Sequence, residues 1–398
     1  MTKKEKIKGG TFSQNKIEPI HRWYEYIEGY SSCLISNELN RIFAENPKIE
    51  TVYDPFCGTG TTGLVASRMG LVPFYSESNP FMQTVVSTKL NTVKAFCQEC
   101  HIHDLEQYVS IVQQMDIHHF DSWDGFEKFF VSEQLDVVLS IKALIQEEKN
   151  PIISELLMLA LSAVIVRASR MIRRGDLRYA TEKEYRHENA VDLFVDKLKQ
   201  IIEDIEQFGS SISHGITKIS EDARDNKEHD LFDCVITSPP YLNGTNYIRN
   251  TKLELKLNDF VRTEADLPMF HSKGIVAGIN NVSKRSGSKP ILPVVEPYFE
   301  RLCESAYDKR IPEMVVAYFY DMSCVIDALH NSTRNNGYFV MDIGDSQFGG
   351  VHIPTHDILS AICIERGFLQ TGEEILRERR SKNGMLLSQR LLRFRLEK

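Results

Sequence analysis

The stretch IETVYDPFCGTGTTG, residues 49–63, joins an apolar run to a glycine-rich turn. Residues 49–53 are rich in β-branched and aromatic side chains, which is typical of a buried strand. Residues 61–69 follow the glycines and have the composition of a short helix. A strand, a glycine turn and a helix in immediate succession are typical of an α/β protein whose turn faces a ligand. The stretch therefore predicts an α/β fold with a binding site at the carboxyl end of this strand.

Acidic residues beside this turn indicate the kind of ligand. The glycines satisfy the dinucleotide pattern G-x-G-x-x-G, but in that pattern the first glycine follows the strand almost directly. Here Asp54-Pro55-Phe56-Cys57 intervenes and places a carboxylate at the strand end, which suits an ammonium group and disfavours a pyrophosphate. Glu77 closes the next expected strand, residues 71–75, where it can accept hydrogen bonds from both hydroxyls of a ribose. A ribose and an amino-acid ammonium without phosphate describe S-adenosylmethionine; an NAD-dependent oxidoreductase is the least favoured alternative.

A second informative stretch is ITSPPYLNG, residues 236–244, which ends an apolar run that begins at Leu231. Two consecutive prolines cannot donate the hydrogen bonds of a sheet, so the strand must stop there. The chain thereby fixes a serine, two prolines and an aromatic ring at a strand end: Ser238, Pro239, Pro240 and Tyr241.

Elsewhere the pattern predicts one α/β core that two insertions interrupt. The core comprises residues 1–94, 211–250 and 312–398; residues 95–210 have a helical period with no clear strand, and residues 251–311 are rich in loop residues. Further strands are expected at 215–219, 337–343, 369–377 and 390–396, and further helices at 79–91, 312–330 and 355–366.

Composition restricts the setting of the protein. The chain has 398 residues and a formal net charge of −8, so a nucleic-acid partner must be held by local basic patches. The most apolar run, 153–166, contains Glu155 and is too short to span a membrane, so we expect a buried helix. The lysine-rich N-terminus lacks the apolar segment of a signal peptide. We therefore expect a cytoplasmic protein and no membrane partner.

The eight cysteines are scattered, which excludes a disulfide framework and indicates a reducing compartment. One cluster, Cys97-Gln98-Glu99-Cys100-His101-Ile102-His103, contains zinc-ligand residue types. Four ligands within seven residues would be cramped, and no second pair lies at finger spacing. We expect a helix start here and no metal site.

The two motifs together resemble the amino-methyltransferases of DNA, which methylate cytosine N4 or adenine N6, and the serine in T-S-P-P-Y resembles the cytosine-N4 branch. The resemblance implies a Rossmann-like S-adenosylmethionine-dependent methyltransferase fold with a mostly parallel seven-stranded sheet. It also implies site residues. The cofactor-binding residues that it implies are Asp54, Phe56, Gly58, Gly60, Thr61 and Thr62 in the glycine loop, Glu77 at the ribose, Asp222 near the adenine, and His21, Trp23 and Tyr30 in an N-terminal motif that closes over the methionine end.

The resemblance assigns catalysis to Ser238, Pro239, Pro240 and Tyr241. The exocyclic amine of a base is a poor nucleophile because its lone pair is delocalised into the ring. Acceptors around the NH₂, the Ser238 Oγ and the Pro239 carbonyl, can localise that lone pair, and Tyr241 can stack on a base rotated out of the duplex. Methylation at cytosine C5 would need a cysteine after a proline, and no cysteine of this chain follows one.

DNA contacts are expected at local basic runs in the two insertions. The candidates are Arg170, Arg173 and Arg174 in the helical insertion, and Lys284 and Arg285 in the loop-rich one. The favoured function is a site-specific cytosine-N4 methyltransferase acting on double-stranded DNA of a prokaryotic nucleoid, the modification enzyme of a restriction system with a cognate restriction endonuclease as its partner. The alternatives are an adenine-N6 enzyme on the same fold, an RNA methyltransferase, and a catalytically silent DNA-binding subunit.

Overall fold

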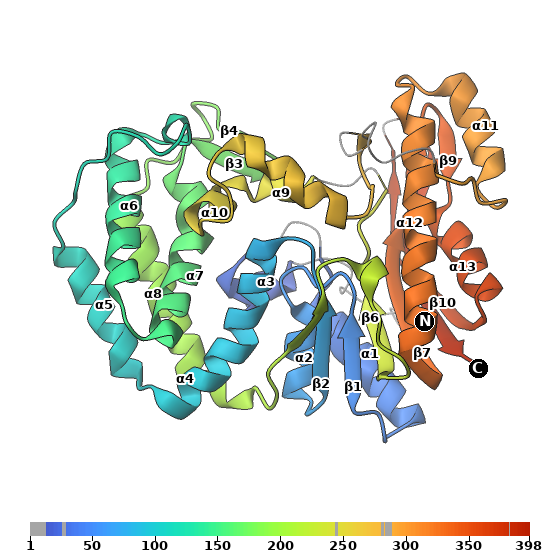
Figure 1. The fold of residues 1–398 in the computed structure, drawn as a ribbon, viewed down its shortest axis with the longest axis horizontal. Coiled ribbons are helices and arrows are strands. Elements are labelled where there is room, and N and C mark those ends of the chain that lie inside the picture. The colour runs from blue at the N-terminus through green and yellow to red at the C-terminus, as the bar shows by residue number, and fades with distance from the viewer. Residues whose placement is uncertain (1–12, 26–28, 243–245, 280–281, 283–288, 382) are drawn as a thin grey trace, which may run out of the picture.

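A computed structural model describes residues 13–25, 29–242, 246–279, 282, 289–381 and 383–398. It shows two connected parts, a sheet flanked by helices and a lobe made mainly of helices (Figure 1).

The sheet has seven strands in the order β10-β11-β7-β6-β1-β2-β5. Their bounds are β1 Thr51–Asp54, β2 Val72–Ser76, β5 Thr217–Ser220, β6 Phe232–Thr237, β7 Thr333–Gly344, β10 Phe368–Arg380 and β11 Leu386–Leu396. All neighbouring pairs are parallel except β7 with β11 and β11 with β10, which are antiparallel. The chain runs outward from β1 to β2 and β5 on one side and to β6 and β7 on the other. This order confirms the predicted Rossmann-like α/β fold and places its switch point between β1 and β6.

Helices cover both faces of the sheet because successive side chains of a strand point to opposite faces. Tyr53, Val235 and Phe339 pack into one apolar cluster with α12 and α13. Their neighbours Val52, Cys234 and Val340 pack into another with α1 and α2. The helices around the sheet are α1 Ser32–Glu45, α2 Thr61–Arg68, α3 Pro80–Ser87, α11 Glu296–Ser305, α12 Arg310–Ser332 and α13 Thr355–Glu365.

The helical lobe lies between β2 and β5 in the chain. A π-helical turn, Thr88–Thr92, continues α3 into α4 Val93–Glu99, and α5 Ile102–Gln114, α6 Ser132–Glu147, α7 Pro151–Ala168 and α8 Ala190–Phe208 follow. Helix α7 is long and apolar enough, by composition, to cross a membrane. It packs against α6 and α8, and Leu156 and Leu157 on it are fully buried, as expected for a core helix.

Two parts of the fold differ from the prediction. Residues 95–210 are not purely helical, because β3 Met171–Arg174 and β4 Asp176–Tyr179 form a hairpin. Gly175 makes the tight turn possible, since its φ of +76° suits glycine. A second small hairpin, β8 Ser346–Phe348 with β9 Val351–Ile353, follows β7 and was also not predicted.

The start of the segment predicted to be loop-rich, residues 251–311, is instead helical. It contains α10 Lys252–Leu257 and a 3-10 helix Glu264–Lys273, and α9 Tyr247–Asn250 directly precedes it. All six residues of α10 are buried. Leu253, Leu255 and Leu257 belong to the same apolar cluster as α6, α7 and α8. The Nζ of Lys252 lies 3.9 Å from the ring centre of Phe129 in the lobe. Residues 247–257 therefore return to the helical lobe after β6, as Figure 1 shows.

Candidate active site at the carboxyl edge of the sheet

A cavity lies where β1, β2 and β6 end, because parallel strands bring their carboxyl ends to one edge of the sheet. Its lining residues fall into four groups in space. They contribute Tyr30, Pro55, Phe56, Cys57, Gly58, Thr59 and Thr61 around the glycine loop; Glu77, Ser78 and Asn79 after β2; Ser238, Pro240, Asn246, Tyr247 and Ile248 after β6; and Glu221, Ala223 and several residues of 270–277 on the remaining side. Of the predicted site residues, the structure thus brings together Tyr30, Phe56, Gly58, Thr61, Glu77, Ser238 and Pro240.

The glycine loop has a backbone shape that other residues would not adopt readily. Gly58 and Gly60 have φ values of +53° and +84°. Gly60 is the N-cap of α2, and a Cβ there would lie 3.2 Å from Val86 Cγ2. The loop therefore combines left-handed φ angles, which glycine adopts without strain, with close packing, and it brings backbone groups to the cavity.

Glu77 is held by the two loops on either side of it. Its Oε2 accepts a hydrogen bond from the Gly58 N–H at 2.8 Å, and its Oε1 accepts one from the Asn79 N–H at 2.8 Å. Burial raises the pKa of Glu77 to about 7. Each oxygen keeps a second acceptor position. The carboxylate has the chemistry to accept hydrogen bonds from the two hydroxyls of a ribose, and its place at the ribose stays a prediction.

Asp54 does not line the cavity, and its expected direct contact with an ammonium group is not what the structure shows. Its side chain is buried, and both of its oxygens have protein partners. Oδ1 accepts hydrogen bonds from Thr237 Oγ1 at 2.7 Å and from the Phe56 N–H at 3.0 Å. Oδ2 accepts one from the Tyr30 hydroxyl at 2.7 Å. Tyr30 also shares a hydrogen bond with Thr62. Asp54 thus joins the ends of β1 and β6 and positions Tyr30, which itself lines the cavity.

The stretch after β6, which the sequence predicts to be catalytic, is anchored residue by residue. The Tyr318 hydroxyl donates to the Pro240 carbonyl at 2.9 Å, and the Tyr241 hydroxyl donates to Asp342 Oδ1 at 3.3 Å. The Ser346 hydroxyl donates to the Leu242 carbonyl at 2.6 Å. Three consecutive residues are therefore fixed by partners from α12, β7 and β8.

These anchors were not predicted from the sequence. Asp342 lies in a strand that the sequence predicted, but its role as an anchor for Tyr241 depends on tertiary contacts. Gln389 Nε2 donates hydrogen bonds to both of its carboxylate oxygens, each at 2.9 Å. Burial raises the pKa of Asp342 to about 7. Tyr318 lies in the middle of α12 and is fully buried, so its sequence context resembles that of any core tyrosine.

His21 and Trp23 lie away from the cavity, which corrects their predicted place at the cofactor. Both are buried in the 3-10 helix His21–Trp23. The indole Nε1 of Trp23 donates to Asp204 Oδ2 on α8 at 2.8 Å. The same oxygen accepts the Ile20 N–H at 2.7 Å, so this segment docks the N-terminal region onto the helical lobe.

Asp222 also has a different role from the one predicted. Its carboxylate pairs with Arg224, with an Oδ2 to Nη2 distance of 2.6 Å, and it caps the 3-10 helix Ala223–Asp225. Its two neighbours, Glu221 and Ala223, are the residues of this segment that line the cavity.

The predicted DNA-contacting arginines divide into buried and exposed ones. Arg173 is a structural residue, because its Nη2 lies 2.6 Å from Glu254 Oε1 and its side chain is 16% exposed. Arg170 is exposed, and Arg174, 67% exposed, lies 3.2 Å from Glu184. Lys284 and Arg285 lie outside the described residues.

Metal ligation finds no support in the described part of the chain, where no group of three or more His, Cys, Asp or Glu side chains could hold an ion. In the Cys97–His103 cluster, His101 is the N-cap of α5 and forms a reciprocal capping box with Asp104.

The sheet order and the cavity at its switch point together define the class of protein. They form a Rossmann-like methyltransferase fold, and the cavity residues suit an S-adenosyl cofactor: positive-φ glycines that allow close approach, a carboxylate for ribose hydroxyls, and the rings of Tyr30 and Phe56.

Known proteins agree with this class. No protein-family model matches the chain. It is 25% identical over 403 residues to the type II methyltransferase M.AvaI of a Nostoc species, covering 90% of this chain and 81% of the relative. It is 21% identical over 436 residues to the type II methyltransferase M.BsoBI of Geobacillus stearothermophilus, covering 94% and 83%. A third relative, the type II methyltransferase M.MvaI of Kocuria varians, is 24% identical over 262 residues, 58% of this chain and 55% of its own length.

A solved rRNA methyltransferase, aviRa from Streptomyces viridochromogenes, aligns over 96% of this chain and 92% of its own with 8% identity and a TM-score of 0.33, which is too distant to bear on function. The sequence relatives and the fold together make this chain an enzyme of the methyltransferase class, with S-adenosylmethionine as its methyl donor.

Proposed function

We propose that this enzyme methylates an exocyclic amine of a base in double-stranded DNA, with cytosine N4 as the target. The observation that carries the proposal is that Ser238 and Pro240 line the same cavity as Glu77 and Gly58. One cavity thus joins a place for the methyl donor to acceptor groups for an amine. The type II methyltransferase relatives support a site-specific modification enzyme of a restriction system. A cognate endonuclease as its partner is part of the proposal.

The residues present can activate the amine without a covalent intermediate. Ser238 Oγ and the Pro239 carbonyl would accept the two N–H groups and localise the nitrogen lone pair. S-adenosylmethionine, which Glu77 and the Gly58 loop would hold, would supply an electrophilic methyl group to this nitrogen, and the methylated amine would release one proton to water. Because Tyr318 holds the adjacent Pro240 carbonyl, the acceptors are oriented before the base arrives.

The cysteine at the cavity does not suit nucleophilic catalysis. Cys57 lines the cavity, but it follows Phe56, and burial raises the pKa of its thiol well above the usual value. A thiolate is therefore disfavoured, which supports direct transfer to an amine over methylation at a ring carbon.

The target base would be held by stacking. The ring of Tyr241 lies against Gly344, where a Cβ would come within 3.2 Å of Tyr241 Cε2, and the hydroxyl contacts Asp342. With one edge fixed in this way, the ring can serve as a stacking platform for a base that leaves the duplex. Outside the cavity, we assign phosphate contacts to the exposed Arg170 and Arg174 on the helical lobe, and we extend this assignment to Lys284 and Arg285.

The decisive experiment is nucleoside mass spectrometry of genomic DNA from a methylation-deficient bacterium, before and after expression of the protein. We expect N4-methylcytosine to appear with the wild type and to be absent with Ser238→Ala. N6-methyladenine as the sole product would keep the mechanism and change the target to adenine, the second candidate. No methylated base in DNA, with methyl groups found in RNA, would contradict the proposal.

A further inference from the structure

The chain that follows the catalytic motif is bound to the β3–β4 hairpin of the helical lobe. Asn250, the last residue of α9, uses its whole side-chain amide for this contact. Its Oδ1 accepts the Leu177 N–H at 2.6 Å, and its Nδ2 donates to the Gly175 carbonyl at 2.6 Å. The amide thus pairs with the hairpin backbone as a neighbouring strand would.

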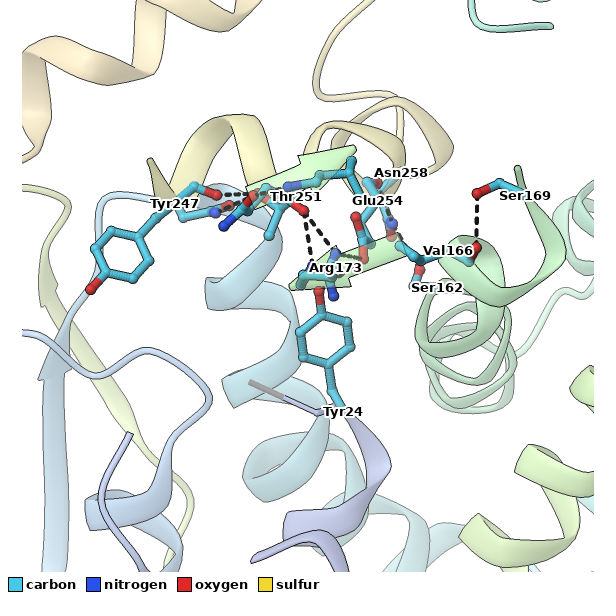
Figure 2. A network of polar contacts seen from close by, with 12 residues as sticks. Tyr24, Ser162, Val166, Ser169, Arg173, Tyr247, Thr251, Glu254 and Asn258 are labelled. Carbon is cyan, nitrogen blue, oxygen red and sulfur yellow. Dashed lines mark hydrogen bonds and ion pairs between the residues drawn. The ribbon is translucent and has the colours of Figure 1, made fainter. Parts of the chain in front are cut away.

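A buried ion pair strengthens the same junction (Figure 2). Arg173 on β3 donates through Nη2 to Glu254 Oε1 on α10 at 2.6 Å, and through Nη2 and Nε to the Asn250 carbonyl at 2.8 and 3.2 Å. Tyr24 donates to the same Glu254 oxygen at 2.9 Å. The Glu254 side chain is 1% exposed. A planar guanidinium with this many partners fixes the angle between hairpin and helix.

The other side of α9 forms a wall of the cavity. Asn246, the N-cap of α9, and Tyr247 and Ile248 in the helix line the cavity. Figure 2 shows the Tyr247 ring pointing away from the Arg173 network. Thr251 accepts a hydrogen bond from Asn79 at 2.8 Å, so the segment is also attached to the loop beyond Glu77. Helix α9 therefore lies between the hairpin and the cavity.

We propose that Arg173, Glu254 and Asn250 are positioning residues that hold the Asn246–Ile248 wall against the target base. The inference rests on the proposed function and deepens it, because it makes the β3–β4 hairpin of the helical lobe part of the machinery that places the base opposite Ser238. We call Arg173, Glu254 and Asn250 the clamp. Tyr247 is the aromatic residue that the clamp presents to the base, because it lines the cavity and an aromatic ring can stack on any of the four bases.

The test uses two variants of the full-length enzyme. Arg173→Met with Glu254→Met removes both charges together, so that neither is left buried without its partner. Asn250→Asp keeps the shape of the side chain but replaces the donor to the Gly175 carbonyl with a carboxylate oxygen. Both should raise KM for unmethylated genomic DNA and lower kcat, with kcat/KM falling by about 10²-fold, the scale of a roughly 1 Å misplacement.

Three further measurements separate positioning from stability. The Kd of the demethylated cofactor, S-adenosylhomocysteine, should stay within about twofold by calorimetry, because the Gly58–Glu77 contacts are untouched. Hydrogen exchange should accelerate in peptides covering 246–251. The matched control is Arg393→Met with Glu38→Met, which removes a pair 2.6 Å apart and similarly buried, at 15% and 6% exposure, that does not line the cavity. It should lower thermal stability and leave kcat and KM unchanged.

The outcomes keep the two proposals apart. A wild-type enzyme that transfers no methyl group to DNA would refute the proposed function. A wild type that is active, with clamp variants that keep its kcat and KM, would overturn the positioning role. Loss of cofactor affinity in step with activity would also overturn it, because the clamp would then support the cofactor loops and not the wall beside the base.

Discussion

Glu77 gives the sharpest test of the cofactor site, because its ionisation should control binding near neutral pH. Burial raises its pKa to about 7, and each oxygen already accepts one backbone N–H. The ionised form therefore offers one free acceptor position per oxygen to the ribose hydroxyls. Protonation turns one of these acceptors into a donor. If only the ionised form binds, the apparent Kd should rise about tenfold from pH 8 to pH 6, as the ionised fraction falls from about 0.9 to about 0.1.

The assay is calorimetric titration with S-adenosylhomocysteine between pH 5.5 and 8.5. Glu77→Gln should bind weakly at every pH and show no slope in this range. Glu221→Gln is the matched control, since Glu221 also lines the cavity but its hydrogen bond with Lys273 lowers its pKa, so that it stays ionised throughout. That variant should keep the slope of the wild type. Wild-type affinity that is flat, or that tightens as the pH falls, would refute the assignment of Glu77 to the ribose.

Four other changes test the remaining parts of the site. Ser238→Ala should bind cofactor normally and lose about 10²–10³-fold in kcat by single-turnover kinetics, as on removal of one preorganised polar group. Gly60→Ala should weaken S-adenosylhomocysteine binding in calorimetry far more than Gly70→Ala, which has a similar φ, +81° against +84°, but has nothing within 4 Å of the new Cβ. The folded pKa of Asp342, about 7, lies above its unfolded value, so stability that is present in acid is lost as the pH rises through 7. In urea unfolding, the wild type should therefore lose about 1.4 kcal/mol between pH 6 and pH 8 through this group, and Asp342→Asn should not show that loss. Arg170→Glu with Arg174→Glu should weaken DNA binding and reduce its salt slope in fluorescence anisotropy, with cofactor affinity unchanged.

The sequence predicted those parts of the site that local chemistry determines. Gly58 follows β1, Glu77 follows β2 and Ser238 follows β6, and the parallel pairing of these strands brings all three residues to one edge of the sheet. Asp54 was predicted at the right place but with the wrong exposure. Its partner Thr237 stands 183 residues later, and no local pattern shows that the two strand ends meet there.

The arginines of the helical lobe show why charge alone was a poor guide. Arg170, Arg173 and Arg174 form one basic run in the sequence. Side chains along β3 point alternately to its two faces, so Arg173 points to the buried Glu254 on α10, whereas Arg170 and Arg174 are exposed. The prediction had no strand in this region, so it could not distinguish the two faces. Reading MIRRGDLRY as two short strands around a glycine would have supplied that distinction.

The path of the chain explains why the site draws on distant segments. The helical lobe is inserted after β2, yet residues 247–257, which follow β6, return to it and bury all of α10 there. The chain after β6 is thus held at residues 240–242 by Tyr318, Asp342 and Ser346 of the core, and from Asn250 onward by the lobe. The chain that follows β6 therefore contacts the core at its start and the helical lobe further along. The residues that the lobe holds extend over 250–254. Contacts between the lobe and DNA would therefore act on catalysis through this part of the chain.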